Sequence, residues 1–499
     1  MGAPDPTPWP LDHLALRGRP DAVALVAGKT SLTYRELERE VGLTAALLLQ
    51  SGLGRGDRVA SWMGKTALAC ILPLACARAG LVHVPINPVL KRAQAAHILR
   101  DSGARLLIGN QARLNALEGA DHSDARLLST EEWSAEAADL LPPSDQDPGR
   151  LAALMYTSGS TGRPKGVMLS HANLWLGAIS VAHYLGLSSS DRTLAVLPLA
   201  FDYGQNQLLS TWAAGGQVIA LDYLLPRDVI RAVGRHDVTV LAGVPPLWLQ
   251  LAEQDWREAG QPLRTLTNSG GHLPEPTVRR LRALFPEARL HLMYGLTEAF
   301  RSTSLDPDLA DSSPDSVGTA IPFAEVMVVR PDGREAEPGE EGELVHAGPL
   351  VGQGYWNDPA RTAERFRPAP DFSRYGGMAV WSGDTVVKSE NGLIHFRGRF
   401  DTMIKTSGNR LSPNEIEEAA LASGAASQAL AIGVPDERLG QAILLVAIGK
   451  GDDAEARLRD YFARELPAFM MPARIEWRDS LPLSPNGKID RAALEREFA

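Results

Sequence analysis

The chain has 499 residues, of which 44% are hydrophobic, and its 50 Lys and Arg against 60 Asp and Glu give a formal net charge of −10. This globular composition predicts two or more packed units at ~100–200 residues per domain, and the acidic balance argues against a nucleic-acid binder. No secretory signal opens the chain, and no run of ~18 apolar residues predicts a membrane span. We therefore expect a cytoplasmic protein with neither nucleic acid nor a membrane as partner.

Helix and strand signals alternate from the N-terminus onward. A capping box from Thr33 to Glu36 predicts a helix that runs to about residue 50. Apolar periodicity predicts further helices at 67–80 and 92–102, and strands at 57–62, 81–86 and 106–108. Cys70 and Cys76 fall in the helix predicted at 67–80, where we expect them to be buried small hydrophobic residues and to form neither a disulfide nor a metal site.

The pattern changes twice farther along the chain. Residues 120–150 are polar and contain prolines, which predicts a surface excursion, and the alternation then resumes from 151 to about 289. Such alternation predicts parallel sheets covered by helices, that is, an α/β fold. Residues 318–396 hold shorter strand-like pieces between Gly and Pro, which predicts a β-rich subdomain.

A small unit is expected at the C-terminal end. The character of the sequence changes near 397–405, and Ser412, Pro413 and Glu415 form a helix start. The residues after it carry helix, strand, strand and helix signals, enough for a small α/β domain. We therefore predict a large N-terminal domain over residues 1–400 and a small C-terminal domain over residues 401–499.

The sharpest local signal is a polar loop at residues 156–166, which reads Tyr-Thr-Ser-Gly-Ser-Thr-Gly-Arg-Pro-Lys-Gly. It follows a buried strand predicted at 151–155. Glycines let backbone N–H groups turn toward a phosphate, hydroxyls donate hydrogen bonds, and Lys165 adds a positive charge. The loop is not a Walker motif, because Lys165 lacks the preceding Gly and the following Ser or Thr. The alternative is a flexible polar loop without a ligand.

This loop resembles the signature of the adenylate-forming superfamily, which contains acyl-CoA synthetases, adenylation domains of peptide synthetases and luciferases. Four further motifs resemble those of the family in the same order, at residues 293–298, 381–384, 398–408 and 483–490. The resemblance covers essentially the whole chain. It implies a large AMP-binding domain with a small mobile C-terminal domain, ATP and Mg²⁺ as cofactors, and a phosphopantetheine thiol as acceptor.

The resemblance also implies which residues form the site. Residues expected to hold the nucleotide are Thr157, Ser158, Gly159, Ser160, Thr161, Gly162, Gly271, His272, Met293, Tyr294, Gly295, Asp384 and Arg399. Residues expected to act in catalysis are Lys165, Thr297, Glu298 and Lys488. Two more are expected at the hinge and the thiol tunnel, Asp401 and Gly408.

Each implied role suits the chemistry of its side chain. Tyr294 would stack on adenine, Thr297 would contact the α-phosphate, and Glu298 would hold Mg²⁺, a hard cation that prefers oxygen ligands. Asp384 would accept both ribose hydroxyls. Lys488 would bridge the acyl carboxylate and the α-phosphate, where charge builds up in the transition state. The alternatives are a turn-capping Asp384 and an ordinary surface lysine at 488.

The acid substrate is indicated by Asp202, which follows Phe201. This pair resembles amino-acid-activating members, in which the Asp holds the substrate ammonium; alternatively, Asp202 pairs with a protein arginine or caps the next helix. Arg301 could pair with Asp202, meet an acidic substrate or point outward. The residues expected to line the substrate pocket are Asp202, Tyr203, Asn206, Gly270, Met293, Arg301 and Ser302.

Three functions remain open at this point. The first is a ligase that adenylates a small amino acid, with L-proline as the named candidate, and loads a carrier protein in trans, because no carrier domain follows Ala499. The second is an acyl-CoA synthetase for an aliphatic or amine-bearing acid. The third is an inactive nucleotide-binding scaffold. Leu296 and Asn409 depart from the common pattern and leave CoA and a carrier protein both open as acceptor.

Overall fold

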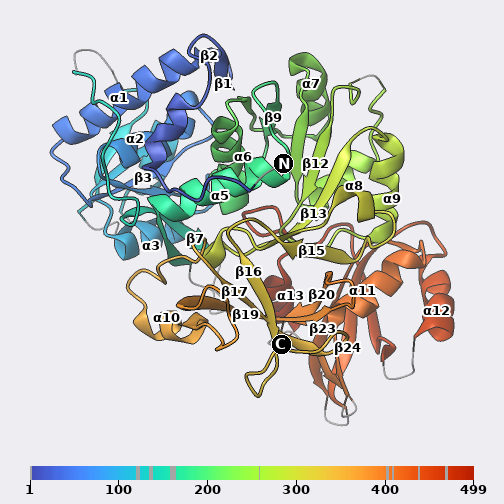
Figure 1. The fold of residues 1–499 in the computed structure, drawn as a ribbon. Helices are drawn as coiled ribbons and strands as arrows, with labels where there is room; N and C mark the ends of the chain where they lie inside the picture. Colours follow the sequence, from blue (N-terminus) through green and yellow to red (C-terminus); the bar gives the residue numbers. More distant parts are fainter. Residues whose placement is uncertain are drawn as a thin grey trace.

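The structure is a computed structural model that describes residues 3–119, 124–133, 139–157, 164–257, 259–399, 404–406, 409–436, 439–466 and 470–498. The described strands form three sheets with helices packed on them, so the predicted α/β fold class is confirmed. Figure 1 shows the N-terminal elements in blue and green, the β-rich segment in yellow and orange, and the C-terminal elements in orange to red.

Six described strands form the first sheet, in which all neighbours are parallel except β7 and β8. The strands in spatial order are β6 (Arg126–Ser129), β5 (Leu106–Gly109), β3 (Arg58–Trp62), β4 (Val82–Pro85), β7 (Leu151–Thr157) and β8 (Lys165–Ser170). The helices of this part are α1 (Tyr34–Gln50), α2 (Ala67–Arg78), α3 (Arg92–Ser102), α4 (Gln111–Ala116) and α5 (His171–Tyr184). The predicted capping box is present at the start of α1, where the Thr33 hydroxyl and Glu36 carboxylate exchange bonds with each other's backbone.

The second sheet is larger and changes character halfway across. Its parallel half runs β13 (Arg289–Tyr294), β12 (Thr265–Asn268), β11 (Val240–Gly243), β9 (Arg192–Ala195), β10 (Gln217–Ala220) and β1 (Val23–Ala27), with β2 (Thr30–Thr33) antiparallel at the edge. Its helices are α6 (Asp202–Ala213), α7 (Pro226–His236), α8 (Pro245–Ala252) and α9 (Glu275–Leu284). One apolar core joins α1, α2, α5 and α6 to strands of both sheets.

Beyond β13 the same sheet continues with antiparallel strands, which confirms the predicted β-rich segment. These strands are β14 (Thr303–Ser304), β15 (Ser316–Ala320), β20 (Ile394–Arg399), β19 (Met378–Lys388), β17 (Glu341–Ala347) and β16 (Glu325–Val329), with β18 (Phe366–Pro368) on β19. Short helices in the large part of the chain are η1 (Leu11–Leu16), η2 (Thr297–Ala299), η3 (Pro307–Leu309) and α10 (Pro359–Arg365).

The C-terminal residues form a sheet of their own. Its described strands are β22 (Asn409–Leu411), β21 (Ile404–Thr406), β24 (Gly440–Gly449) and β23 (Ala426–Asp436), with β25 (Arg474–Trp477) beside β24. The helices are α11 (Pro413–Ala422), α12 (Ala454–Glu465) and α13 (Arg491–Phe498). Apolar side chains pack on both faces of this sheet. The predicted boundary at residue 401 lies outside the described residues.

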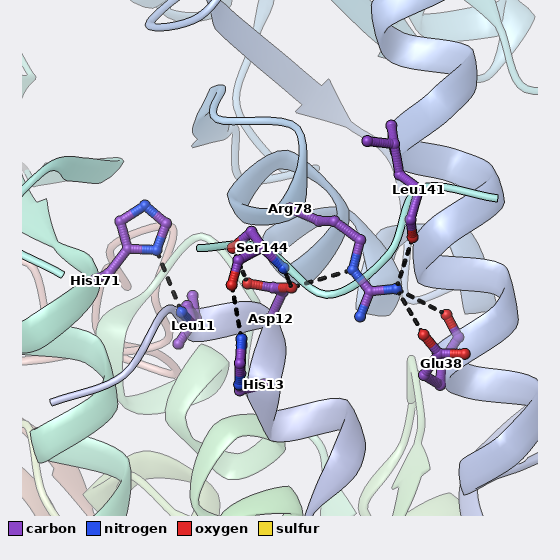
Figure 2. A network of polar contacts seen from close by, with 8 residues as sticks. All are labelled: Leu11, Asp12, His13, Glu38, Arg78, Leu141, Ser144 and His171. Carbon is purple, nitrogen blue, oxygen red and sulfur yellow. Dashed lines mark hydrogen bonds and ion pairs between the residues drawn. The ribbon is translucent and has the colours of Figure 1, made fainter. Parts of the chain in front are cut away.

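A buried charge network fastens the N-terminal segment to α1 and α2 (Figure 2). At the end of α2, Arg78 Nε donates to Asp12 Oδ2 at 3.1 Å and Nη1 donates to Glu38 Oε1 at 2.9 Å. Asp12 also accepts from the backbone N–H and the hydroxyl of Ser144, at 3.0 and 2.6 Å. The side chains of Arg78 and Asp12 are both 0% exposed, so each charge depends on the other for compensation.

The described part of residues 120–150 is mostly exposed, as the expected surface excursion requires, but it also contributes to the sheet and to a buried network. Their described part contains β6, whose Leu127 and Leu128 extend the parallel sheet, and it contains Ser144, which reaches the buried Asp12. The predicted burial of Cys70 and Cys76 is confirmed. Among the described helices, none combines the length and apolar character needed to cross a lipid bilayer.

Candidate active site

The candidate site lies where neighbouring parallel strands of the large sheet end. The carboxyl ends of β9, β11, β12 and β13 meet at one edge, the usual place for ligands in such sheets. Helix α6 begins at Asp202 a few residues after β9, Gly270 follows β12, and Thr297 follows β13. The fold therefore brings three motifs together that are far apart in the sequence.

Lys165 and Glu298 meet beside a third residue that sequence reasoning missed, Tyr355. Lys165 Nζ lies 3.3 Å from Glu298 Oε1, and the Tyr355 hydroxyl lies 2.6 Å from both of these atoms. Burial opposes the ionisation of Glu298, but Lys165 and Tyr355 outweigh it and lower the pKa of this carboxyl. Tyr355 is held by a bridge to Val167 in β8, a pairing across almost two hundred residues that no local pattern announces.

Tyr294 and Asp384 form a second pair on the sheet edge. The Tyr294 hydroxyl donates to Asp384 Oδ2, and its ring lies 6.2 Å from that of Phe396, centroid to centroid. Asp384 is opposite Arg399 in the β19–β20 ladder, which brings the third and fourth motifs side by side.

Lys488 reaches this site from the C-terminal part of the chain. Its Nζ lies 4.6 Å from the centroid of the Phe201 ring. A Cβ added at Gly270, whose φ is +83°, would lie 2.6 Å from Lys488 Cε, so a residue without a side chain is required here. Asn87, after β4, donates to Pro485 O at 2.8 Å and to Asn486 Oδ1 at 3.0 Å and thereby holds the turn that presents Lys488.

Asp202 is a buried carboxylate inside the site, 6% exposed. It accepts a hydrogen bond from Thr297 Oγ1 at 3.1 Å, and among the described residues no Lys, Arg or His nitrogen lies within 4.0 Å of it. Burial raises the pKa of Asp202, although Arg301, Lys488 and Thr297 act in the opposite direction. Among the described residues no arginine lies within ion-pair distance of Asp202, but the backbone N–H of Tyr203, in the first turn of α6, also acts to lower the pKa of this carboxyl.

Arg301 lies close enough to Asp202 to lower the pKa of that carboxyl, and it does not point outward. It is 2% exposed, its Nη1 donates to Ser269 Oγ at 2.7 Å, and its guanidinium lies 4.6 Å from the centroid of the Tyr203 ring. A cavity of about 20 Å³ beside it, about one water molecule in size, is lined by Tyr203, Asn206 and Met293 among others.

The remaining predicted residues fall into three groups. Ser302 is buried but not among the residues that line this cavity, and its Oγ lies 2.8 Å from His346 Nδ1. His272 Nε2 lies 3.4 Å from Glu418 Oε1 on α11. Outside the described residues lie Ser158, Gly159, Ser160, Thr161, Gly162, Asp401 and Gly408.

Comparisons with known proteins agree with this geometry. The family described as AMP-binding enzyme matches residues 13–356, and the AMP-binding enzyme C-terminal domain matches residues 415–488. A feruloyl-CoA synthase from Amycolatopsis sp is 34% identical over 98% of both chains. An L-proline–[L-prolyl-carrier protein] ligase from Pseudomonas fluorescens is 29% identical over 96% of both.

Solved structures share the fold over the full length. An o-succinylbenzoate CoA synthetase from Bacillus subtilis, in complex with its acyl-adenylate intermediate, superposes with a TM-score of 0.86 at 25% identity, covering 98% of each chain. Another structure of that enzyme contains ATP and a magnesium ion. The chain thus belongs to the AMP-binding enzyme family and is an ATP-dependent ligase that forms an acyl adenylate.

Proposed function

We propose that this ligase activates a small carboxylic acid that carries an amine, and then passes the acyl group to the thiol of a carrier protein supplied in trans. The observation that carries the proposal is the buried Asp202, whose carboxylate has no cation within 4.0 Å among the described residues. A buried carboxylate needs a counter-charge, and an ammonium group on the substrate supplies one.

Two bond changes make up the proposed reaction. In the first step a carboxylate oxygen of the acid attacks the α-phosphorus of ATP, the bond to the bridging oxygen breaks, and pyrophosphate leaves. In the second step the thiolate attacks the acyl carbon and AMP leaves. Lys488 would stabilise the negative charge that builds up when one anion attacks another, a task for a fixed cation in a site shielded from water.

The nucleotide would lie across the two pairs described above. Lys165 and the 157–162 loop would hold the β- and γ-phosphates, and Thr297 would contact the α-phosphate. Tyr294 would stack on the adenine, and Asp384 and Arg399 would bind the ribose. Glu298 fits Mg²⁺, because this cation is often held by one carboxylate and substrate phosphates, and the described residues contain no cluster of three or more His, Cys, Asp or Glu for a metal that needs a full protein cage. Bound there, Mg²⁺ would neutralise phosphate charge.

We also propose that the C-terminal unit begins at residue 401 and rotates between the two steps, with Asp401 as hinge and Gly408 in the thiol tunnel. In support, strands up to β20 pair within the first two sheets, and strands from β21 onward pair only with one another in the described residues. Hinges are few residues that absorb a large backbone change.

The test is ATP–pyrophosphate exchange across the common amino acids, including L-proline, and a ladder of short and medium aliphatic acids. We expect exchange with an amine-bearing acid, and Asp202→Asn should reduce it by about 50-fold or more because the ammonium then lacks its counter-charge. Asp255→Asn, at an exposed position, is the matched control and should leave exchange unchanged. Equal exchange with and without the amine would overturn the proposal.

One alternative is favoured by a specific observation, the feruloyl-CoA synthase relative that is 34% identical over 98% of the chain. Under this alternative the enzyme forms a CoA thioester of an acid that has no amine. Transfer of the activated acid to free CoA, compared with transfer to a phosphopantetheine-bearing carrier protein, separates the two acceptors.

A further inference from the structure

Arg301 is a buried cation whose hydrogen-bonding capacity is largely unused. Among the described residues, only Nη1 has a side-chain hydrogen-bond partner, Ser269 Oγ, while Nε and Nη2 are buried without a hydrogen-bond partner. No carboxylate of the described residues lies within 4.0 Å of the guanidinium. Buried polar groups in native proteins nearly always bond to protein, ligand or ordered water, and an unpaired buried charge is strongly unfavourable, so this edge favours a group that brings a negative charge.

The two unused nitrogens have a particular geometry. Nε and Nη2 form one edge of the planar guanidinium, and their N–H bonds run parallel. A carboxylate matches such an edge with two parallel hydrogen bonds. A hydroxyl or a carbonyl oxygen has lone pairs for both donors but carries no charge to compensate the guanidinium. The free edge of Arg301 therefore selects a planar anionic group.

A strained turn delivers Arg301 to this position. Phe300 has φ 60° and ψ −61°, and the Arg301 N–H donates to Ala299 O at 2.6 Å, which closes a rare three-residue turn. The Phe300 ring fills the space above Gly177 in α5, where an added Cβ would lie 2.2 Å from the ring. Such strain persists only where the surroundings enforce it, and it concentrates at ligand sites.

The cavity beside Arg301 has further unsatisfied polar atoms. Asn206 Oδ1 and Gln207 Nε2 belong to residues that line it, and both are buried without a hydrogen-bond partner in the part of the chain that the structure describes. An aliphatic side chain of a substrate would leave all of these groups unpaired, whereas a polar side chain could satisfy them.

We infer that Arg301 binds a second carboxylate of the acid, remote from the carboxylate that is activated, so that the substrate is a short dicarboxylic acid. Combined with the amine, which rests on the proposed function, this makes the substrate an amino acid with an acidic side chain. Lys488, whose Nζ lies 4.6 Å from the centroid of the Phe201 ring, is left to serve the reacting carboxylate.

The experiment is ATP–pyrophosphate exchange with four acids of one carbon skeleton. L-Aspartate has both groups, L-2-aminobutyrate only the amine, succinate only the second carboxylate, and butyrate neither; L-glutamate, L-norvaline, glutarate and valerate repeat the design one carbon longer. We expect the second carboxylate to raise kcat/KM by about 100-fold or more, both in the acids that carry the amine and in those that lack it. The amine comparison tests Asp202 separately, so either idea can fail alone.

Variants link that preference to Arg301. Arg301→Met should bring the ratio of kcat/KM for aspartate over 2-aminobutyrate to within about threefold of unity. Arg301→Lys should restore part of this ratio, because lysine returns the positive charge but not the two parallel N–H donors of the guanidinium. Arg279→Met, at an exposed arginine of α9, is the control and should keep the wild-type ratio.

Three results would overturn the inference. In the first, the wild-type enzyme prefers the matched acid that lacks the second carboxylate. In the second, no acid with a second carboxylate supports exchange. In the third, Arg301→Met keeps the wild-type ratio of kcat/KM for aspartate over 2-aminobutyrate.

Discussion

Arg78 and Arg301 are both buried guanidinium groups, but among the described residues only Arg78 has carboxylates within ion-pair distance. Arg78 donates to two carboxylates and two backbone carbonyls, with Nη2 alone left over. Arg301 has one hydroxyl partner. The first charge belongs to the fold, since it ties η1, α1 and the segment around Ser144 together (Figure 2). The second is explained by a group that the chain itself does not supply.

This comparison predicts a large loss of stability when Arg78 is replaced and almost no change when Arg301 is replaced. Arg78→Met should reduce the free energy of unfolding by about 3–5 kcal/mol, because Asp12 would remain charged and buried without its partner. Arg301→Met should change it by less than about 1 kcal/mol, because an uncompensated charge is removed. Thermal or urea unfolding of the three proteins checks both values. A loss of equal size in the two variants would contradict the distinction.

A double substitution sharpens the assignment of Arg78 to the fold. Asp12→Leu combined with Arg78→Met removes both buried charges, and we expect it to recover about 2 kcal/mol relative to Arg78→Met alone, since replacing a whole buried pair is far less harmful than breaking it. A double-mutant cycle by urea unfolding measures the coupling. Additive losses would mean that Arg78 and Asp12 act independently.

The smallest expected effect concerns a third charge, Glu418, which is only partly buried. Burial and the neighbouring Asp315, Glu417 and Glu415 raise its pKa to about 7 from the usual 4.5, while Arg397 lowers it. The folded state therefore takes up a proton between these values, and the contribution of Glu418 to stability is present below pH 4.5 and lost as the pH rises through 7. The midpoint of unfolding should fall more between pH 5 and pH 8 in the wild type than in Glu418→Gln. Plots of midpoint against pH that run parallel for the two proteins would contradict this prediction.

Much of the fold was predictable, because helix caps and apolar periodicity are local. The capping box at Thr33 and the helix over 92–102 match α1 and α3. The nucleotide motifs could be recognised for a similar reason, since phosphate and ribose demand particular residue types in short runs.

The environments of the charges could not be predicted. The Tyr355 hydroxyl meets Lys165 from 190 positions away. The unusual backbone at Phe300 depends on space left above Gly177 in a different helix. The sequence left three possibilities open for Arg301, and only the packing around it shows that its side chain does not point outward.

The two bonds from Asn87 to the 485–486 turn have a kinetic consequence. They join the N-terminal sheet to the same turn that presents Lys488, so the lysine can leave only when these bonds break. In the rotation proposed above, the strength of this contact would contribute to how long the lysine stays beside the reacting groups. A stronger contact between Asn87 and the 485–486 turn would favour complete adenylation of each acid but slow the turnover. A weaker contact would let Lys488 leave earlier, so that more cycles would end before the acid is adenylated.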